Sequence, residues 1–234
     1  MLLGLIRPDQ GEITILGQRD PKNTALKDRM GVVFDDLFLP EDTSLKDLEN
    51  FCSGIYSHWE KQTFYYYVER FHLLKDQPIK NYSRGMKMKL SMAVALSHQA
   101  ELLLLDEATS GLDPVAREEI LDLLMDFMQD EDHTILISSH ILSDLEKIAD
   151  YIVFIHQGKL LFMEAKDVLK EEYRICSLSK EDAEKLDPKA IIGRKVHAFG
   201  QELLVRKNLV PKNLKLEKPS IEDIMVYFVK GEEK

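Results

Sequence analysis

Apolar side chains recur along the chain with two different spacings. Residues 43–55 and 58–74 place them at helical spacing, and a further helical pattern begins after Ser83. Residues 102–105, four leucines in a row, and the apolar stretch 133–138 lack this spacing and predict strands, with the leucine run buried on both faces. Strands that alternate with helices predict an α/β chain with a largely parallel sheet.

The ends of the chain have weaker patterns. Met1–Ile6 has the spacing of the end of an amphipathic helix, and residues 11–17 alternate like a strand. Residues 151–162 predict a hairpin that turns near Gly158. Short strand-like pieces and a final helix at 220–229 then predict a small α+β extension at the C-terminal end.

Composition excludes several classes of protein. The net charge of −10 argues against nucleic acid as the main partner, because binding to a phosphate backbone needs a basic face. The two cysteines, Cys52 and Cys176, lack metal-site spacing and are expected to be free thiols in a reducing cytosol. No apolar run approaches the roughly 18 residues of a membrane helix, so we expect any membrane role to be peripheral.

Two carboxylates, Asp106 and Glu107, directly follow the leucine run. Open α/β sheets bind ligands at the carboxyl ends of their strands, so this position favours a functional site. An alternative is that the acids lie at a helix N-terminus and stabilise its dipole. The two residues alone do not decide between these interpretations.

Four features occur in a particular order. They are "YSRGM" at 82–86, "LLLLDE" at 102–107, "SGLD" at 110–113, and His140 after "TILISS". Together they resemble the nucleotide-binding subunit of ATP-binding-cassette (ABC) transporters, in particular bacterial ABC-2-type exporters. The resemblance covers residues 1–165. It implies a P-loop NTPase-like core with a mostly parallel sheet.

The resemblance also implies a division of the chain. Residues 1–165 would form the ABC ATPase domain, with a helical signature subdomain at about 43–98. Residues 166–234 would form a C-terminal accessory region.

The resemblance implies roles for the residues at the sheet edge. Asp106 would hold Mg²⁺, usually through water, as suits a hard cation. Glu107 would polarise the water that attacks ATP, because phosphoryl transfer depends mostly on positioning and electrostatics. His140 would contact the γ-phosphate. A histidine after a strand is by itself more often a cap or a surface residue.

The signature stretch implies nucleotide contacts across a dimer. Ser83 and Gly85 retain the family pattern "LSGGQ", whereas Arg84 and Met86 depart from it. These four residues would bind ATP held by an opposite subunit, at a helix N-terminus that suits an anion. Asp113 matches the aspartate that couples the two sites. The alternative is an ordinary capped helix.

Two features depart further from the family. Asp35 stands where the family has a glutamine that contacts the metal, and an aspartate can still meet Mg²⁺ or a partner helix. The phosphate-binding pattern G-x-x-x-x-G-K-[ST] occurs nowhere in the 234 residues. We therefore expect the natural protein to be longer, with a further core strand beside residues 102–106.

The resemblance implies an ATP-hydrolysing subunit that powers export. It would form a homo- or heterodimer with a second ATP-binding subunit and drive a separate membrane-spanning permease from the cytoplasmic face of the cell membrane. The alternative is a non-hydrolysing regulatory or interaction subunit, because the phosphate-binding loop is missing. An ABC-type ATPase acting on DNA or ribosomes and an unrelated metal hydrolase fit the chain less well.

Overall fold

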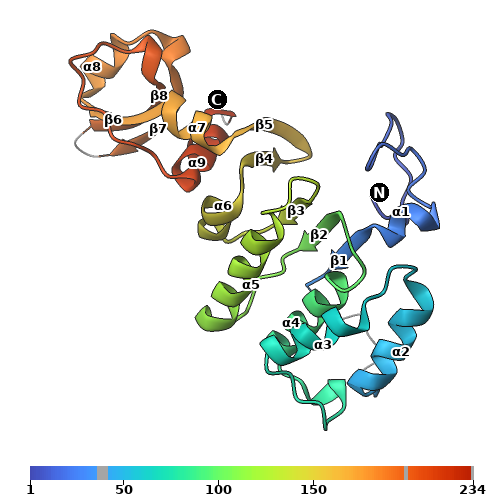
Figure 1. Cartoon of the computed structure of the whole chain (residues 1–234). Helices are drawn as coiled ribbons and strands as arrows, with labels where there is room; N and C mark the ends of the chain where they lie inside the picture. The colour runs from blue at the N-terminus through green and yellow to red at the C-terminus, as the bar shows by residue number, and fades with distance from the viewer. Residues whose placement is uncertain (36–41, 198–199, 233–234) are drawn as a thin grey trace. The chain divides into compact units, whose positions relative to one another are not determined.

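A computed structural model describes most of the chain (Figure 1). The described residues are 1–35, 42–197 and 200–232. They divide into two compact units, called unit 1 (Met1–Ile141) and unit 2 (Leu142–Lys234). This boundary reflects compactness and lies before residue 165, whereas the predicted division at 165 follows the family resemblance and stays a prediction.

Unit 1 consists of a parallel sheet and a group of helices. Its elements in chain order are α1 (Thr24–Asp28), β1 (Met30–Val33), α2 (Leu45–Ile55), α3 (Lys61–Arg70), a 3-10 turn (Ile79–Asn81), α4 (Arg84–Ala95), β2 (Leu102–Asp106), α5 (Pro114–Phe127) and β3 (Thr134–Ser138). The strand order is β1-β2-β3, and both pairings are parallel. The predicted α/β class with a parallel sheet is confirmed.

The leucine run forms the central strand of this sheet. In β2, Leu103, Leu104 and Leu105 are buried, as a strand covered on both faces requires. The strand pairs with β1 on one side and with β3 on the other. No side of β2 is left for another strand, so the prediction that a further core strand lies beside residues 102–106 is wrong.

Serine residues cap two helices of unit 1. Ser44 caps α2 through a reciprocal capping box with Asp47, and the Ser83 hydroxyl caps α4. Helix α4 packs against β1 and against α3, which in turn contacts α2 (Figure 1). The apolar stripe of α3 is buried at Phe64 and Val68, so it forms core.

Two predictions near the N-terminus are wrong. Met1–Ile6 forms turns and bends, with Gly4 at a φ of 71°, a left-handed conformation that ends a helix. Residues 11–17 contain only an isolated bridge between Ile15 and Gln18. Alternation favours a strand only where a neighbouring strand offers backbone partners, and none lies beside this segment among the described residues.

Unit 2 combines two antiparallel sheets with helices. Its elements in chain order are α6 (Leu142–Ile148), β4 (Tyr151–His156), β5 (Lys159–Ala165), α7 (Lys166–Glu172), β6 (Tyr173–Leu178), α8 (Lys180–Glu184), a 3-10 turn (Pro188–Ala190), β7 (Ile191–His197), β8 (Gly200–Arg206), a 3-10 turn (Lys207–Leu209) and α9 (Ile221–Glu232). Strands β4 and β5 form the predicted hairpin, and β6, β8 and β7 form a separate sheet in that order.

Helix α9 provides the core of unit 2. Tyr227, Ile224 and Ile221 are fully buried and pack in one cluster with Leu204 of β8. The helix approaches β7 so closely that a Cβ on Gly193 would lie 2.1 Å from the carbonyl oxygen of Tyr227. A residue without a side chain is therefore required at this contact.

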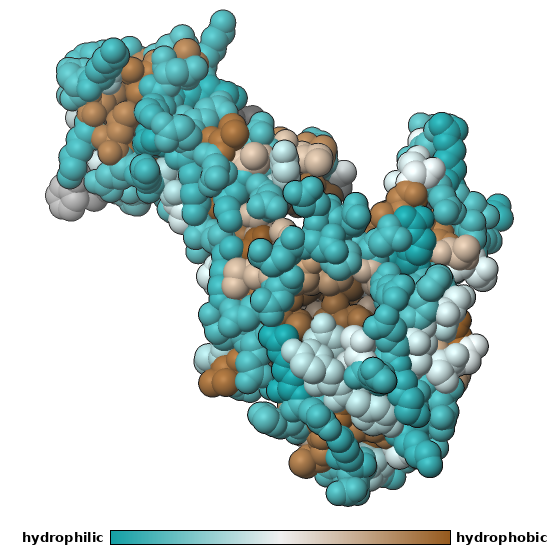
Figure 2. All heavy atoms as spheres, in the orientation of Figure 1, coloured by the Kyte–Doolittle hydropathy of each residue, from teal (hydrophilic) through white to brown (hydrophobic). Residues whose placement is uncertain are grey.

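The face of the molecule drawn in Figure 2 is mostly polar. In Figure 2, teal polar side chains cover most of the visible face, and brown apolar side chains reach the surface in patches. One such region is a cleft of about 490 Å³ in unit 1, which includes Leu3, Val32, Leu104 and Leu136 and extends to Asp106. Among the described residues, no helix has the length and apolarity that crossing a membrane demands.

A glycine-to-alanine pair tests the packing of α4 on β1. A Cβ on Gly31 would lie 2.5 Å from Leu103 Cδ2 and 2.8 Å from the Ala95 carbonyl oxygen. We expect Gly31→Ala to lower the free energy of unfolding by about 1–3 kcal/mol, as overpacking does. The matched control is Gly54→Ala in α2, where nothing lies within 4 Å of the new Cβ. It should leave stability unchanged or raise it. Equal stability of the two variants in urea unfolding would contradict this packing.

Candidate functional site

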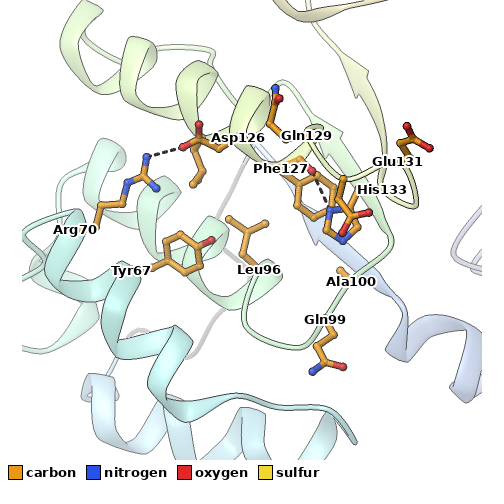
Figure 3. Close-up of a pocket in the computed structure, with 12 residues that line it drawn as sticks. Tyr67, Arg70, Leu96, Gln99, Ala100, Asp126, Phe127, Gln129, Glu131 and His133 are labelled. Carbon is orange, nitrogen blue, oxygen red and sulfur yellow. Dashed lines mark hydrogen bonds and ion pairs between the residues drawn. The ribbon is translucent and has the colours of Figure 1, made fainter.

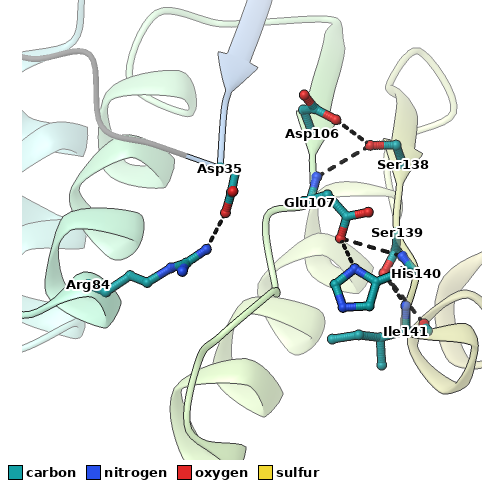
Figure 4. A network of polar contacts seen from close by, with 8 residues as sticks. All are labelled: Asp35, Arg84, Asp106, Glu107, Ser138, Ser139, His140 and Ile141. Carbon is teal, nitrogen blue, oxygen red and sulfur yellow. Dashed lines mark hydrogen bonds and ion pairs between the residues drawn. The ribbon is translucent and has the colours of Figure 1, made fainter.

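The carboxyl ends of β2 and β3 bring the first residues of the candidate site together. Asp106 and Ser138 end these strands and are partners in the parallel register. The Ser138 hydroxyl donates a hydrogen bond of 2.6 Å to the Asp106 carboxylate (Figure 4). Parallel pairing therefore places the candidate metal ligand at the edge where α/β sheets bind ligands.

Glu107 leaves the sheet with an unusual backbone. Its φ of 52° lies in the left-handed region, which a residue with a side chain adopts at a cost. Its N–H donates to the Ser138 carbonyl oxygen at 3.1 Å and also lies 3.3 Å from the Ser138 hydroxyl. These contacts hold the turn in place. Backbone strain at a candidate catalytic residue is consistent with function.

The side chain of Glu107 meets His140. Its Oε2 lies 2.6 Å from His140 Nδ1, and the His140 N–H lies 3.4 Å from the same oxygen (Figure 4). A carboxylate can only accept, so the proton of the short contact is on Nδ1. In a neutral ring, Nε2 is then left as an acceptor. The imidazole is 67% exposed and the carboxylate 29%, so the pair is open to a ligand.

Arg84, in the signature stretch, pairs with Asp35. The guanidinium of Arg84 forms an ion pair with the Asp35 carboxylate (Figure 4). The other signature residues lie in the first turn of α4 or just before it, and the Ser83 hydroxyl accepts from the Met86 N–H at 3.2 Å. Both the capped-helix interpretation and a nucleotide role are compatible with this geometry.

Asp113 caps helix α5. Its Oδ1 accepts hydrogen bonds from the N–H groups of Ala116 at 3.1 Å and Val115 at 3.0 Å, and Pro114 occupies the first helical position. The Ala116 N–H, followed by that of Val115, lowers the pKa of Asp113 below its ordinary value of 3.8. The carboxylate therefore caps α5 within this chain. Its role in coupling the two nucleotide sites of a dimer stays a prediction.

The structure adds one residue that sequence reasoning missed. Ser138 contacts both Asp106 and the backbone of Glu107, although the stretch "TILISS" was used only to locate His140 and no role was assigned to this serine. The available signal was its position, because it ends the strand "TILIS". Only the parallel register with β2 shows that this position faces Asp106.

The metal prediction for Asp106 fits the chemistry of the edge. Among the described residues, no group of three or more His, Cys, Asp or Glu side chains is placed to hold a metal. Mg²⁺ needs no such group, because it is usually bound by one or two carboxylates together with phosphate oxygens and water. Asp106 with the Ser138 hydroxyl suits that mode. Asp35 instead contacts Arg84, and its metal role stays a prediction.

Another cavity lies at the opposite end of these strands. It has a volume of about 670 Å³ and is lined by residues from α3, α5 and the segments that precede β2 and β3, including Ala100 and His133 (Figure 3). Two of its polar side chains have partners within the lining: Arg70 pairs with Asp126 at 3.0 Å, and His133 Nδ1 lies 2.9 Å from the Phe127 carbonyl oxygen. We therefore place the candidate site at the carboxyl edge.

Comparison with known proteins agrees with the motif order. A model of the ABC transporter family matches residues 1–110. The ABC transporter ATP-binding protein NatA of Bacillus subtilis is 30% identical over 181 residues, which are 74% of this chain and 73% of NatA. The chain belongs to the ABC transporter family. Its fold agrees, since the "Structure of ATP binding subunit of ABC transporter" matches with a TM-score of 0.64 and 23% identity over 72% of each chain.

Another relative of this ABC-family chain is longer. The bacitracin transport ATP-binding protein BcrA of Bacillus licheniformis is 35% identical over 177 residues, which are 74% of this chain and 58% of BcrA. The chain spans about half the length of the first curated relatives that it matches. Family and fold are therefore established, whereas activity, substrate and partners are matters for proposal.

The cap of α5 predicts a dependence of stability on pH. The lowered pKa of folded Asp113 means that its stabilisation is complete above the ordinary value of 3.8 and is lost as the pH falls through the lower folded-state value. We expect Asp113→Asn, which keeps a capping oxygen but cannot titrate, to unfold at a lower temperature than the wild type at neutral pH. The difference should shrink between roughly pH 5 and pH 2 in thermal unfolding. A difference that is independent of pH would contradict the role of the charge.

Proposed function

We propose that this chain is the ATP-hydrolysing part of a transporter that exports its substrate through a separate membrane permease. The observation that carries the proposal is the 2.6 Å contact between Glu107 and His140 beside the Asp106–Ser138 pair. It brings a carboxylate base, a histidine and a candidate metal ligand to one edge of a parallel sheet. Membership of the ABC transporter family supports ATP as the proposed substrate.

In the proposed reaction, Glu107 orients a water molecule toward the γ-phosphorus of ATP. A bond forms between the water oxygen and phosphorus, the bond from phosphorus to the β,γ-bridging oxygen breaks, and ADP and phosphate are released. Glu107 accepts the proton that the water loses. His140 holds the Glu107 carboxylate in position through Nδ1 and presents Nε2 toward solvent or the transferred phosphoryl group.

Charge at the phosphates must be neutralised during this reaction. Asp106, oriented by the Ser138 hydroxyl, would hold Mg²⁺, and Asp35 would contribute to the same ion once it is released from Arg84. When bound, Mg²⁺ withdraws negative charge from the phosphate oxygens. The phosphates of a nucleotide on a second subunit would meet the start of α4, and that contact makes a homo- or heterodimer the active form. The residues proposed for this contact are Ser83, Arg84, Gly85 and Met86, and Asp113, before α5, is proposed to couple the two nucleotide sites.

The proposed partners follow from the relatives. The printed names of BcrA and of the lantibiotic relative SrtF of Streptococcus pyogenes describe transport ATP-binding proteins, which supports export as the task of this chain. A membrane-spanning permease subunit would then place the chain at the cytoplasmic face of the cell membrane. The acidic net charge of −10 supports the absence of nucleic acid among its partners.

A second candidate function is a non-hydrolysing regulatory or interaction subunit. It is favoured by one observation, because the 234 residues contain no G-x-x-x-x-G-K-[ST] stretch to bind the β- and γ-phosphates. The two candidates differ in nucleotide affinity. Calorimetric titration of the purified chain with Mg-ATP distinguishes them: the second predicts no binding in the millimolar range.

Glu107→Gln tests the proposed hydrolysis directly. The amide keeps the shape of the side chain but cannot accept a proton, so ATP turnover should fall by about 10²- to 10⁴-fold. ATP-dependent dimerisation should persist. Both are measured on the protein as its own cell makes it, by phosphate release and by light scattering. The control is Glu118→Gln, an exposed position on α5, which should turn over ATP like the wild type. Undiminished turnover in Glu107→Gln would remove Glu107 from its role.

A further inference from the structure

Three segments of unit 1 meet at the guanidinium of Arg84. Arg84 is the first residue of α4, and it pairs with Asp35, two residues beyond the end of β1. It also covers Gly111 in the loop after β2: a Cβ on Gly111 would lie 3.0 to 3.3 Å from three guanidinium atoms. The guanidinium therefore packs directly on backbone, between two loops that leave neighbouring strands.

The position of Arg84 is electrostatically unusual. The N-terminus of a helix carries partial positive charge, so a cation in the first turn is unfavourable there and an anion is favourable. The Asp35 carboxylate neutralises this cation from within the chain. Helix α4 thus begins with a cation whose partner is an internal carboxylate, at a helix end that itself favours an anion.

Both partners are accessible. The side chains of Arg84 and Asp35 are each 50% exposed, and exposed ion pairs are weak enough to exchange partners. A phosphate carries more charge than a carboxylate and offers three oxygens in the geometry that a guanidinium binds. A phosphate that reaches the start of α4 would therefore compete with Asp35 for Arg84.

We propose that Asp35 competes, from within the chain, with a bound anion for Arg84 at the start of α4. In the free subunit its carboxylate occupies Arg84, and a nucleotide phosphate must displace it during assembly of the nucleotide site. The inference rests on the proposed function, which supplies the reason for a phosphate at this edge. It adds regulation of that site, because the ion pair with Asp35 must be broken before Arg84 can bind a phosphate. The pair therefore lowers the affinity of Arg84 for phosphate.

A second ion pair in unit 1 provides a matched comparison. Arg70 ends α3 and pairs with Asp126 at 3.0 Å, with side chains 36% and 65% exposed. A cation at the end of a helix is favourable, and an anion is not stabilised there. Removal of the Asp126 carboxylate therefore changes the net charge by the same amount without freeing an anion position at a helix N-terminus.

The test is titration of the full chain with inorganic triphosphate at low ionic strength, by calorimetry. Asp35→Asn should bind triphosphate about two- to fivefold more tightly than the wild type, the range that an exposed ion pair commands. Arg84→Gln should bind more weakly, and Asp126→Asn should match the wild type. In the unsubstituted chain, triphosphate should also shift the side-chain Nε–H resonance of Arg84 and leave that of Arg70 in place.

Several results would overturn the inference. They are unchanged or weakened binding by Asp35→Asn, an equal gain in Asp126→Asn, or no triphosphate binding by any variant. Because triphosphate binding requires no turnover, the result is independent of Glu107. If the unsubstituted protein does not hydrolyse ATP but Asp35→Asn binds triphosphate more tightly, only the proposed function is contradicted. If the protein hydrolyses ATP but Asp35→Asn shows no tighter binding, only this inference is contradicted.

Discussion

The backbone pairing of β2 with strands on both sides determines where the strand ends of the candidate site lie. Four consecutive leucines can be buried only in a strand that is covered on both faces, and the parallel pairing then brings the ends of β1, β2 and β3 to one edge. Asp106 faces Ser138 as a consequence of register. A shift of one residue would turn Asp106 away from this hydroxyl.

The carboxylates at this edge are held by partners from other segments. Ser138 contacts Asp106, His140 contacts Glu107, and Arg84 contacts Asp35. One contact joins the ends of β2 and β3, and the other two join residues that follow β2 and β1 to a loop residue and to the start of α4. The edge is therefore assembled by polar interactions in addition to apolar packing below it. Such contacts are exposed and individually weak, which leaves them able to rearrange around a ligand.

Close backbone approach recurs in both units and leaves no room for a Cβ at two glycines. Gly31 lets α4 lie against β1, and Gly193 lets α9 lie against β7. In unit 1 this contact fixes the helix that begins with the signature residues relative to the sheet that ends in Asp106. The dependence of the site on packing therefore extends to positions that carry no functional group.

Local sequence determined much of this protein. The burial of the leucine run, the start of α4 after Ser83 and the hairpin near Gly158 were predicted, because burial, capping and turns depend on residues close in the chain. The alternation at residues 11–17 failed, since a strand also needs a neighbour. Only tertiary structure paired Asp35 with Arg84, 49 residues away, and placed Ser138 beside Asp106 across 32 residues. The register between strands and the packing of α4 decide these contacts, and no local periodicity encodes them.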